Sequence, residues 1–260
     1  MEAQLLKDRV AIVTGASRGL GEGIARAFAR EGAAVALFSR NIARLRELER
    51  ELGEGAVAFQ VDVSDAGQVT QAVGEVLERF GRVEILVNNA AIAPSMPFLE
   101  TPDEVRDSVI EVNIKGVWNC TKAVLPGMIA QKYGKIINIS SVTGPMVSGK
   151  GVTAYSASKG AVSGFTRSLA LEVAEHGINV NAICPGSFDT PMMRSLAKPR
   201  GWASEDDYIK ELGKEIPLGR LGTIDEMGDL AVFLASDKSK YITGAEIVID
   251  GGNMIQEHKG

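Results

Sequence analysis

Short apolar, β-branched runs alternate with longer amphipathic runs along almost the whole chain of 260 residues. This alternation is typical of βαβ units, in which helices cover both faces of a parallel sheet. Seven runs predict strands at residues 10–13, 34–38, 56–61, 85–87, 135–139, 179–183 and 245–249. Six runs with helical spacing predict helices at 20–31, 42–52, 66–80, 101–131, 153–175 and 224–235. We therefore expect an α/β fold with a doubly wound, seven-stranded parallel sheet.

The chain shows no linker, internal repeat or change in composition, so we expect residues 1–260 to form a single domain. The least regular stretch is 186–217, where Pro191, Pro199, Gly201 and Pro217 interrupt two short helical pieces after the sixth strand. Ligands of open α/β sheets bind outside the carboxyl ends of the strands. We therefore expect this stretch to cover a substrate. A surface loop without function is the alternative.

Composition and charge exclude several classes of protein. Hydrophobic residues make up 45% of the chain and charged residues 23%, which is typical of a soluble globular protein rather than a disordered one. The chain has 28 Lys and Arg and 33 Asp and Glu, which gives a net charge of -5. It contains no run of basic residues that could neutralise a nucleic-acid phosphate backbone. We expect no nucleic-acid partner.

The cysteines and the N-terminal residues predict a location. Cys120 and Cys184 are too few for a disulfide-stapled scaffold of this size, so we expect a reducing compartment. Residues 1–9 are charged and run directly into an apolar strand, which predicts no signal peptide, and no stretch is long enough to span a membrane. We expect a cytoplasmic protein.

The two histidines do not predict a metal site. His176 and His258 lack metal-ligand spacing, so we expect no metal site.

The first predicted strand ends in a glycine-rich turn. Residues 14–21 read Thr-Gly-Ala-Ser-Arg-Gly-Leu-Gly, and a predicted helix follows at once. The free N–H groups and the dipole of a helix N-terminus favour a pyrophosphate. Glycine permits the tight turn at Gly15, backbone approach to phosphate at Gly19 and close helix packing at Gly21. A βα turn can need glycine merely to turn, but here strand, turn and helix follow in the order of a Rossmann-like dinucleotide site.

The end of the second strand would meet the adenosine ribose of such a cofactor. An acid at this position binds the 2′-OH of NAD, whereas an arginine accommodates the 2′-phosphate of NADP. The chain has Ser39 and Arg40 here and no carboxylate, and Arg18 of the glycine turn can approach the same phosphate. NADP(H) is therefore favoured over NAD(H). The alternative is that Arg40 merely begins a solvated helix.

Tyr155 and Lys159 lie four residues apart near the start of a predicted helix, so they share one helical face. A nearby ammonium and a cationic nicotinamide favour the phenolate and bring the tyrosine pKa from about 10 towards neutrality. Such pairs are also common on exposed helices. Ser140 and Ser141 favour a catalytic role for this pair, because they follow the fifth strand at the edge of the sheet where a substrate is expected.

Several motifs resemble those of the single-domain short-chain dehydrogenases/reductases. The spacing Gly-x-x-x-Gly-x-Gly, the Tyr-x-x-x-Lys pair, a serine 14 residues before the tyrosine and the closing Ile249-Asp250-Gly251-Gly252 all match that family. Residues 115–126 and 141–144 also look like the UcpA-type bacterial oxidoreductases within it. The resemblance implies a carbonyl reductase or alcohol dehydrogenase.

The resemblance implies roles for four catalytic residues, Asn113, Ser141, Tyr155 and Lys159. Tyr155 would exchange a proton with the substrate oxygen, and Ser141 would donate a hydrogen bond to that oxygen. Lys159 would bind the nicotinamide ribose and depress the pKa of Tyr155. Asn113 would hold a water beside Lys159 and so continue a proton relay.

The resemblance also implies how the cofactor is held. Asp62 is similar to the family aspartate that binds adenine, Thr190 to the threonine of a Pro-Gly-x-x-x-Thr motif that holds the carboxamide, and Asn88-Asn89-Ala90 to an Asn-Asn-Ala-Gly motif. Ala91 replaces the last glycine of that motif, so we expect a slightly altered backbone approach. The implied cofactor residues are Gly15, Ser17, Arg18, Gly19, Leu20, Gly21, Ser39, Arg40, Asp62, Val63, Asn89, Ala90, Tyr155, Lys159, Pro185, Gly186 and Thr190. The family commonly forms homotetramers, and we expect one here.

The substrate is less constrained by the sequence. Segments 93–98, 143–153 and 186–217 would supply apolar walls from Pro94, Met96, Phe98, Met146, Met192, Met193 and Trp202. A small aldehyde, ketone, sugar or polyol derivative ranks above a carrier-protein substrate, because the region that would dock the carrier protein is mixed or acidic. Lys150, Arg194, Lys198 and Arg200 lie in the same segments and leave a small keto acid open.

Two other functions stay open. A 3-oxoacyl carrier-protein reductase is the enzymatic alternative, although residues 131–133 and 172–176 lack the basic patch that would dock an acidic carrier protein. A non-catalytic nucleotide-binding redox sensor is the alternative outside enzymes. The presence of Ser141, Tyr155 and Lys159 disfavours it.

Overall fold

The computed structural model describes residues 4–257 and is built around seven strands in the order β3-β2-β1-β4-β5-β6-β7. Each neighbouring pair of strands is parallel. The strands are β1 Val10–Thr14, β2 Ala34–Ser39, β3 Ala56–Gln60, β4 Ile85–Asn88, β5 Gly134–Ile139, β6 Ile178–Pro185 and β7 Glu246–Ile249. All seven predicted strands are therefore confirmed, with differences of one or two residues at their ends.

The strand order reverses between β1 and β4, which pair with each other while their chains continue to opposite sides of the sheet. Such a reversal leaves a crevice outside the carboxyl ends of the two strands. The segments that follow β1 and β4 contain the glycine turn and Asn89. The topology thus brings the predicted cofactor residues to one edge of the sheet.

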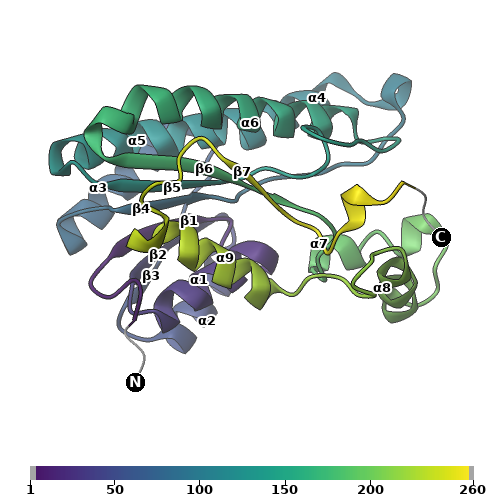
Figure 1. Cartoon of the computed structure of the whole chain (residues 1–260), viewed down its shortest axis with the longest axis horizontal. Helices are drawn as coiled ribbons and strands as arrows, with labels where there is room; N and C mark the ends of the chain where they lie inside the picture. Colours follow the sequence, from purple (N-terminus) through teal and green to yellow (C-terminus); the bar gives the residue numbers. More distant parts are fainter. Residues whose placement is uncertain (1–3, 258–260) are drawn as a thin grey trace.

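Helices cover both faces of the sheet (Figure 1). One face carries α1 Gly19–Arg30, α2 Ile42–Leu52 and α9 Ile224–Ala235; the other carries α3 Ala66–Phe80, α5 Gly116–Gln131 and α6 Thr153–Val173. Ala11 and Val13 of β1 belong to the core of the first face, and Val10 and Ile12 to the core of the second. Because successive strand residues point to opposite faces, both cores require apolar residues, and residues 10–13 of the fully buried β1 are all apolar.

The predicted helix over residues 101–131 is confirmed as a continuous helical path over residues 103–131, but it is not a regular α-helix throughout. The structure has α4 Asp103–Ile110, a π-helical turn Glu111–Lys115, hereafter the π turn, and then α5. Pro102 precedes α4 as its N-cap residue, and the extra residue of the π turn carries the fully buried Asn113 inward. Elsewhere α1 begins one residue earlier than predicted and α6 gives way to a 3-10 turn at Ala174–His176.

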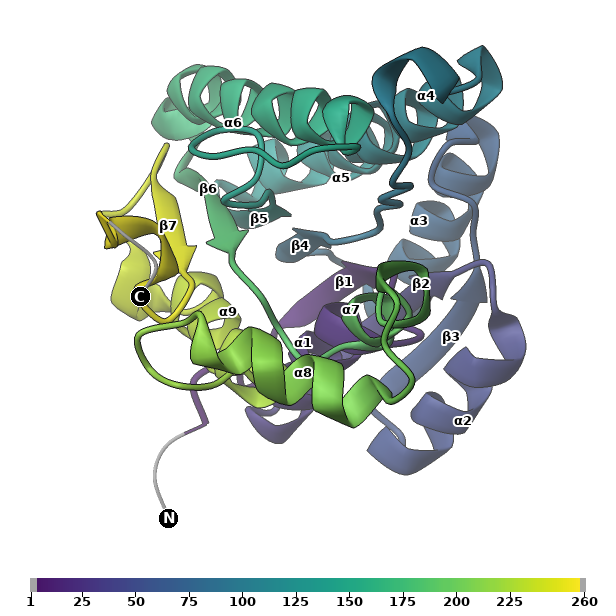
Figure 2. The same cartoon turned by 90° about the vertical axis from the view of Figure 1, so that its right-hand side faces the viewer.

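Residues 186–217 lie beyond the carboxyl ends of the strands and are here named the cover (Figure 2). They contain α7 Pro191–Arg194, a 3-10 turn Lys198–Arg200 and α8 Glu205–Lys214. Tyr208 is the buried centre of the cover, with its ring centroid 6.0 Å from that of Trp202 and its hydroxyl 2.7 Å from the Arg200 guanidinium. The cover is therefore a small packed unit and not an extended loop.

In the part of the chain that the structure describes, no helix is both long and apolar enough to cross a membrane.

Candidate active site

The glycine turn is held in place by Asn89, which follows β4. The Asn89 side-chain amide donates to the Thr14 carbonyl at 2.9 Å, and the Asn89 backbone N–H donates to the Thr14 hydroxyl, also at 2.9 Å. Gly15 adopts a φ of +66°, and a Cβ at Gly21 would lie 2.4 Å from Asn89 Nδ2. Glycine is required at both positions, at Gly15 for the turn and at Gly21 because Asn89 fills the space.

The turn opens on the N-terminus of α1. The N-cap residue Arg18 makes no side-chain capping hydrogen bond, in contrast to α9, where Thr223 and Glu226 form a capping box. Gly19 has a φ of +61°, and a Cβ there would lie 3.6 Å from Thr190 at the start of the cover. Uncapped N–H groups between a glycine-lined turn and Thr190 fit a pyrophosphate.

The ends of β2 and β3 form the site expected for the adenosine. The Ser39 hydroxyl donates to the Ser17 hydroxyl at 3.0 Å and so ties β2 to the glycine turn. Arg40 is 68% exposed at its side chain, and its Nη1 lies 3.9 Å from Oδ2 of Asp62. The other Asp62 oxygen accepts from the N–H and hydroxyl of Ser64 at 3.0 and 2.6 Å. Arg40 thus forms one weak, exposed ion pair, which would not prevent its side chain from turning towards a 2′-phosphate.

Ala91 causes no backbone strain, although it stands where the resemblance implied a glycine. Asp8 and Lys132 are the non-glycine residues with positive φ within residues 4–257. Ala91 is not among them, so its side chain is compatible with the local backbone.

Ser141, Tyr155 and Lys159 meet where β5 ends and α6 begins. The Ser141 side chain lies near enough to the Tyr155 hydroxyl to lower its pKa, and the Ser141 hydroxyl accepts the Thr143 N–H at 3.0 Å. Lys159 is buried, with its ammonium 2.6 Å from the Ile139 carbonyl and 5.7 Å from the centroid of the Tyr155 ring. The structure therefore brings together the three polar groups that the sequence placed in one site.

Burial shifts the pKa values of both Tyr155 and Lys159. Burial raises the pKa of Tyr155 above its usual value, and the Ser141 side chain opposes this shift only in part. Burial also lowers the pKa of Lys159 to about 8. The lowering of the Tyr155 pKa that we expect from Lys159 and a cationic nicotinamide stays a prediction for the cofactor-bound protein, because in the chain alone the ammonium points to the Ile139 carbonyl. The phenol is protonated at neutral pH.

Asn113 uses both N–H groups of its side-chain amide, and one acceptor site of the amide oxygen, within the protein. Its Oδ1 accepts the Ile92 N–H at 2.9 Å, and its Nδ2 donates to the Ile92 carbonyl at 2.9 Å and to the Ser158 hydroxyl at 3.0 Å. These contacts fix the π turn against the segment after β4 and against α6. The predicted role of Asn113 in holding a water beside Lys159 stays a prediction, and the second lone pair of Oδ1 is the side-chain acceptor left for it.

Comparison with known proteins identifies the family. A family model described as enoyl-(acyl carrier protein) reductase matches residues 15–253. The oxidoreductase UcpA of Salmonella typhimurium is 49% identical over 254 residues, 97% of each chain. The chain belongs to the short-chain dehydrogenases/reductases. It is therefore an oxidoreductase of a family that binds NAD(P).

Two further members of this family show the spread of its relatives. The 3-oxoacyl-(acyl-carrier-protein) reductase FabG of Thermotoga maritima is 40% identical over 254 residues, 96% of this chain and 99% of the relative. The crystal structure of a putative short-chain alcohol dehydrogenase from Sinorhizobium meliloti has a TM-score of 0.89 and 36% identity, covering 98% of this chain and 99% of the other. The Rossmann-like fold of the family is thus confirmed, and so is the predicted likeness to UcpA.

The cover of this short-chain dehydrogenase/reductase begins beside Ser141. The Val142 N–H donates to the Pro185 carbonyl at 3.1 Å, which joins the end of β6 to the residue after Ser141. Arg194 donates to both oxygens of Asp189 at 2.6 and 2.8 Å, and to Asp206 at 2.6 Å. Because two carboxylates hold this guanidinium, Arg194 is not free to bind an anionic substrate.

Two groups at the site escaped the sequence analysis, the Ser158 hydroxyl and the Ile139 carbonyl, whereas Ser140 was expected there. The Ser140 hydroxyl donates to the Lys159 carbonyl at 3.0 Å, and Ser158 and the Ile139 carbonyl contact Asn113 and Lys159. A Cβ at Gly144 would lie 2.3 Å from the Ser156 carbonyl, so the segment after β5 presses against α6. Serines that sit buried in a helix interior were the available signal, because serine is not favoured there.

Within residues 4–257 no three His, Cys, Asp or Glu side chains lie close enough to hold a metal ion. His176 lies in the 3-10 turn after α6, and His258 is outside the described residues.

Proposed function

We propose that the protein is an NADP(H)-dependent oxidoreductase that interconverts a small carbonyl compound and its alcohol. The observation that carries this proposal is that Ser141 and Tyr155 lie together at the carboxyl edge of the sheet, with the buried Lys159 ammonium 5.7 Å from the centroid of the Tyr155 ring. The glycine turn lies at the same edge and fits a dinucleotide. An acid and a hydride carrier are what carbonyl reduction requires.

The chain's own residues would act on the substrate oxygen. The nicotinamide, when bound, supplies or accepts the hydride. The Ser141 and Tyr155 hydroxyls would donate hydrogen bonds to the carbonyl oxygen and polarise it. Because burial keeps Tyr155 protonated, its phenol is ready to give its proton to the developing alkoxide. Lys159, with a pKa of about 8, would then return a proton near neutral pH.

The charges of the cover support a neutral substrate. Asp189 and Asp206 both form ion pairs with Arg194, so this group of three side chains carries a net negative charge. Arg200 donates to the Tyr208 hydroxyl. Two of the four cations that left a keto acid open are therefore engaged inside the cover, and an aldehyde, ketone, sugar or polyol derivative is the better candidate. The 40% identity to FabG keeps a 3-oxoacyl thioester as the second candidate.

The proposal is tested by following nicotinamide absorbance with NADPH and NADH. The substrates are aldehydes, ketones, sugar derivatives, acyl thioesters, and keto acids paired with their methyl esters. We expect turnover of neutral carbonyls and preference for each ester over its acid. Turnover of thioesters alone would favour the second candidate. Tight cofactor binding without turnover across the panel would favour the redox sensor.

The preference for NADP(H) predicts the outcome of Arg40→Asp. A charge-assisted hydrogen bond to a 2′-phosphate contributes about 1.5–3 kcal/mol, so kcat/KM with NADPH should fall about 10- to 100-fold. The activity with NADH should stay unchanged or rise, because a carboxylate can accept from a 2′-OH. Both are measured from initial rates over a range of cofactor concentration.

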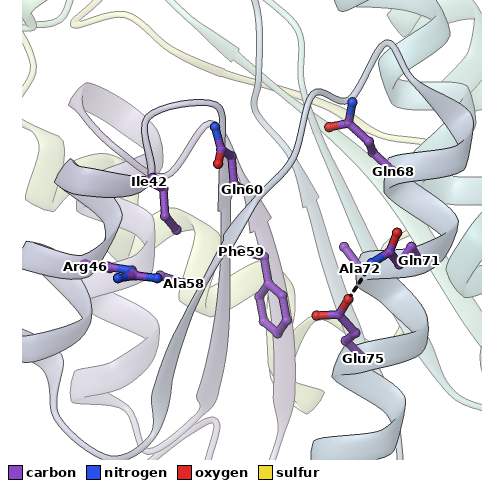
Figure 3. A pocket seen from close by; sticks show the side chains of 9 residues that line it. All are labelled: Ile42, Arg46, Ala58, Phe59, Gln60, Gln68, Gln71, Ala72 and Glu75. Carbon is purple, nitrogen blue, oxygen red and sulfur yellow. Dashed lines mark hydrogen bonds between the residues drawn. The ribbon is translucent and has the colours of Figure 1, made fainter.

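Arg46→Asp serves as the matched control. Arg46 is an exposed arginine of α2 that lines an open hollow of about 280 Å³ between α2 and α3, with Gln71 and Glu75 on the opposite side (Figure 3). The same change of charge there should leave the ratio of NADPH to NADH activity unaltered. An equal loss of NADPH activity in both variants would contradict a specific role for Arg40.

We infer that four copies of the chain associate. Large apolar side chains are exposed on two separate surfaces: Trp118 and Leu171 on α5 and α6, and Tyr241 and Val248 at the β7 edge. Light scattering should give a tetramer. Leu171→Asp and Tyr241→Asp should each yield dimers, because each disrupts one surface. A monomeric unaltered chain would contradict this inference.

We also infer a cytoplasmic location. Cys120 and Cys184 are both buried free thiols, which supports a reducing compartment.

A further inference from the structure

Ser158 connects two of the candidate catalytic residues. Its side chain is buried in α6, one residue before Lys159. The Ser158 hydroxyl accepts a hydrogen bond from Asn113 Nδ2 at 3.0 Å and donates its proton to the Tyr155 carbonyl at 2.7 Å. A single hydroxyl thus contacts both the π turn and the helical turn that carries the phenol.

The direction of these hydrogen bonds is fixed. The Ile92 N–H requires an acceptor, so Asn113 Oδ1 must face it and Nδ2 must face Ser158. The Tyr155 carbonyl accepts the one proton of the Ser158 hydroxyl, which leaves the hydroxyl oxygen to accept from Asn113. The arrangement has one consistent set of donors and acceptors. Removing the hydroxyl leaves a buried Asn113 N–H without this acceptor.

Other buried hydroxyls of α6 bind elsewhere. Ser163 contacts the Ser140 hydroxyl at 3.1 Å, and Thr166 accepts from Asn138 at 2.9 Å and donates to the Val162 carbonyl at 2.8 Å. These two hydroxyls anchor α6 to β5 and its end. Ser158 is distinct because its partner is the π turn.

We propose that Ser158 is a positioning residue for the reaction. It holds the π turn at a set distance from Tyr155 and Lys159. A proton from the Tyr155 phenol could then pass by way of Lys159 towards Asn113 in the π turn. The inference rests on the proposed acid and base role of Tyr155. The position of a proton donor relative to its partner affects the rate of the chemical step more than it affects cofactor binding.

Ser158→Ala tests the inference. We expect kcat to fall about 10- to 100-fold, with the KM for cofactor almost unchanged. We also expect the pH dependence of alcohol oxidation to move to higher pH, because a displaced relay accepts the proton of Tyr155 less readily. Thr166→Val is the matched control, since it also removes a buried hydroxyl of α6. It should lower the thermal midpoint but leave kcat and the pH profile unaltered.

Two further variants complete the test. Ser158→Thr keeps the hydroxyl and should retain most of kcat. The effects of Ser158→Ala and Asn113→Leu on kcat should be less than additive in the double variant, because both break one contact. Unchanged kcat and pH profile in Ser158→Ala, equal losses in the alanine and threonine variants, or full additivity would each overturn the inference. Retained turnover in Tyr155→Phe would instead overturn the proposed function itself.

Discussion

Tyr155→Phe is expected to lower the kcat for carbonyl reduction by about 10³- to 10⁴-fold. The change removes one oxygen, the proton donor, and leaves the ring that packs beside Lys159. The glycine turn, Arg40 and Thr190 are untouched, so the affinity for NADPH should stay within a few-fold of the unaltered chain. Nicotinamide absorbance measures the turnover, and a fluorescence titration measures cofactor binding.

Tyr133→Phe provides the matched control for this prediction. The Tyr133 hydroxyl also forms a hydrogen bond, to Asp237 at 3.0 Å, and burial likewise raises its pKa. It follows α5 and precedes β5, at the opposite end of that strand from Ser141. Loss of this hydroxyl should leave kcat unaltered. Substantial turnover in Tyr155→Phe, or equal losses in the two variants, would contradict the assignment.

Lys159→Met is expected to abolish turnover and to stabilise the cofactor-free protein at pH 7. The pKa of Lys159 falls from 10.5 to about 8 on folding, because burial disfavours the ammonium. One pKa unit corresponds to about 1.4 kcal/mol, and the lost hydrogen bond to the Ile139 carbonyl offsets part of the gain, so we expect about 1–3 kcal/mol.

The sign of this effect sets its pH dependence. The unfolded chain binds the Lys159 proton more tightly than the folded one, so the charged lysine opposes folding in full below pH 8. That cost disappears as pH rises from about 8 to about 10.5, and the advantage of the methionine variant should disappear with it. Urea unfolding at several pH values measures this. The exposed Lys122, changed to methionine, should show no such trend; a parallel trend there would contradict the explanation.

Some elements could be predicted from the sequence for a clear physical reason. The strands were found because a sheet covered on both faces requires continuous apolar runs, as in residues 10–13. The need for glycine at positions 15 and 19 was also predictable, and both adopt positive φ. These features depend on local pattern alone.

Other features depend on contacts between distant residues. A helical period of apolar residues over 101–131 does not reveal one inserted residue, so the π turn was missed. The sequence shows that Arg194 is a cation but not that Asp189 and Asp206 hold it. In the same way, the spacing of Tyr155 and Lys159 places them on one face, whereas the Ile139 carbonyl decides where the ammonium points.

The contact between the glycine turn and the cover has a consequence for how the cofactor and the substrate bind together. Gly19 of the glycine turn lies next to Thr190 of the cover, since a Cβ on Gly19 would be 3.6 Å from it. A phosphate bound in the turn would therefore lie close to the first residues of the cover. Thermodynamic coupling between two ligands is reciprocal. If a bound dinucleotide raises the affinity of the site for the substrate by some factor, the substrate raises the affinity for the dinucleotide by the same factor. Calorimetric titration of each ligand with and without the other should then give the same ratio of dissociation constants for both.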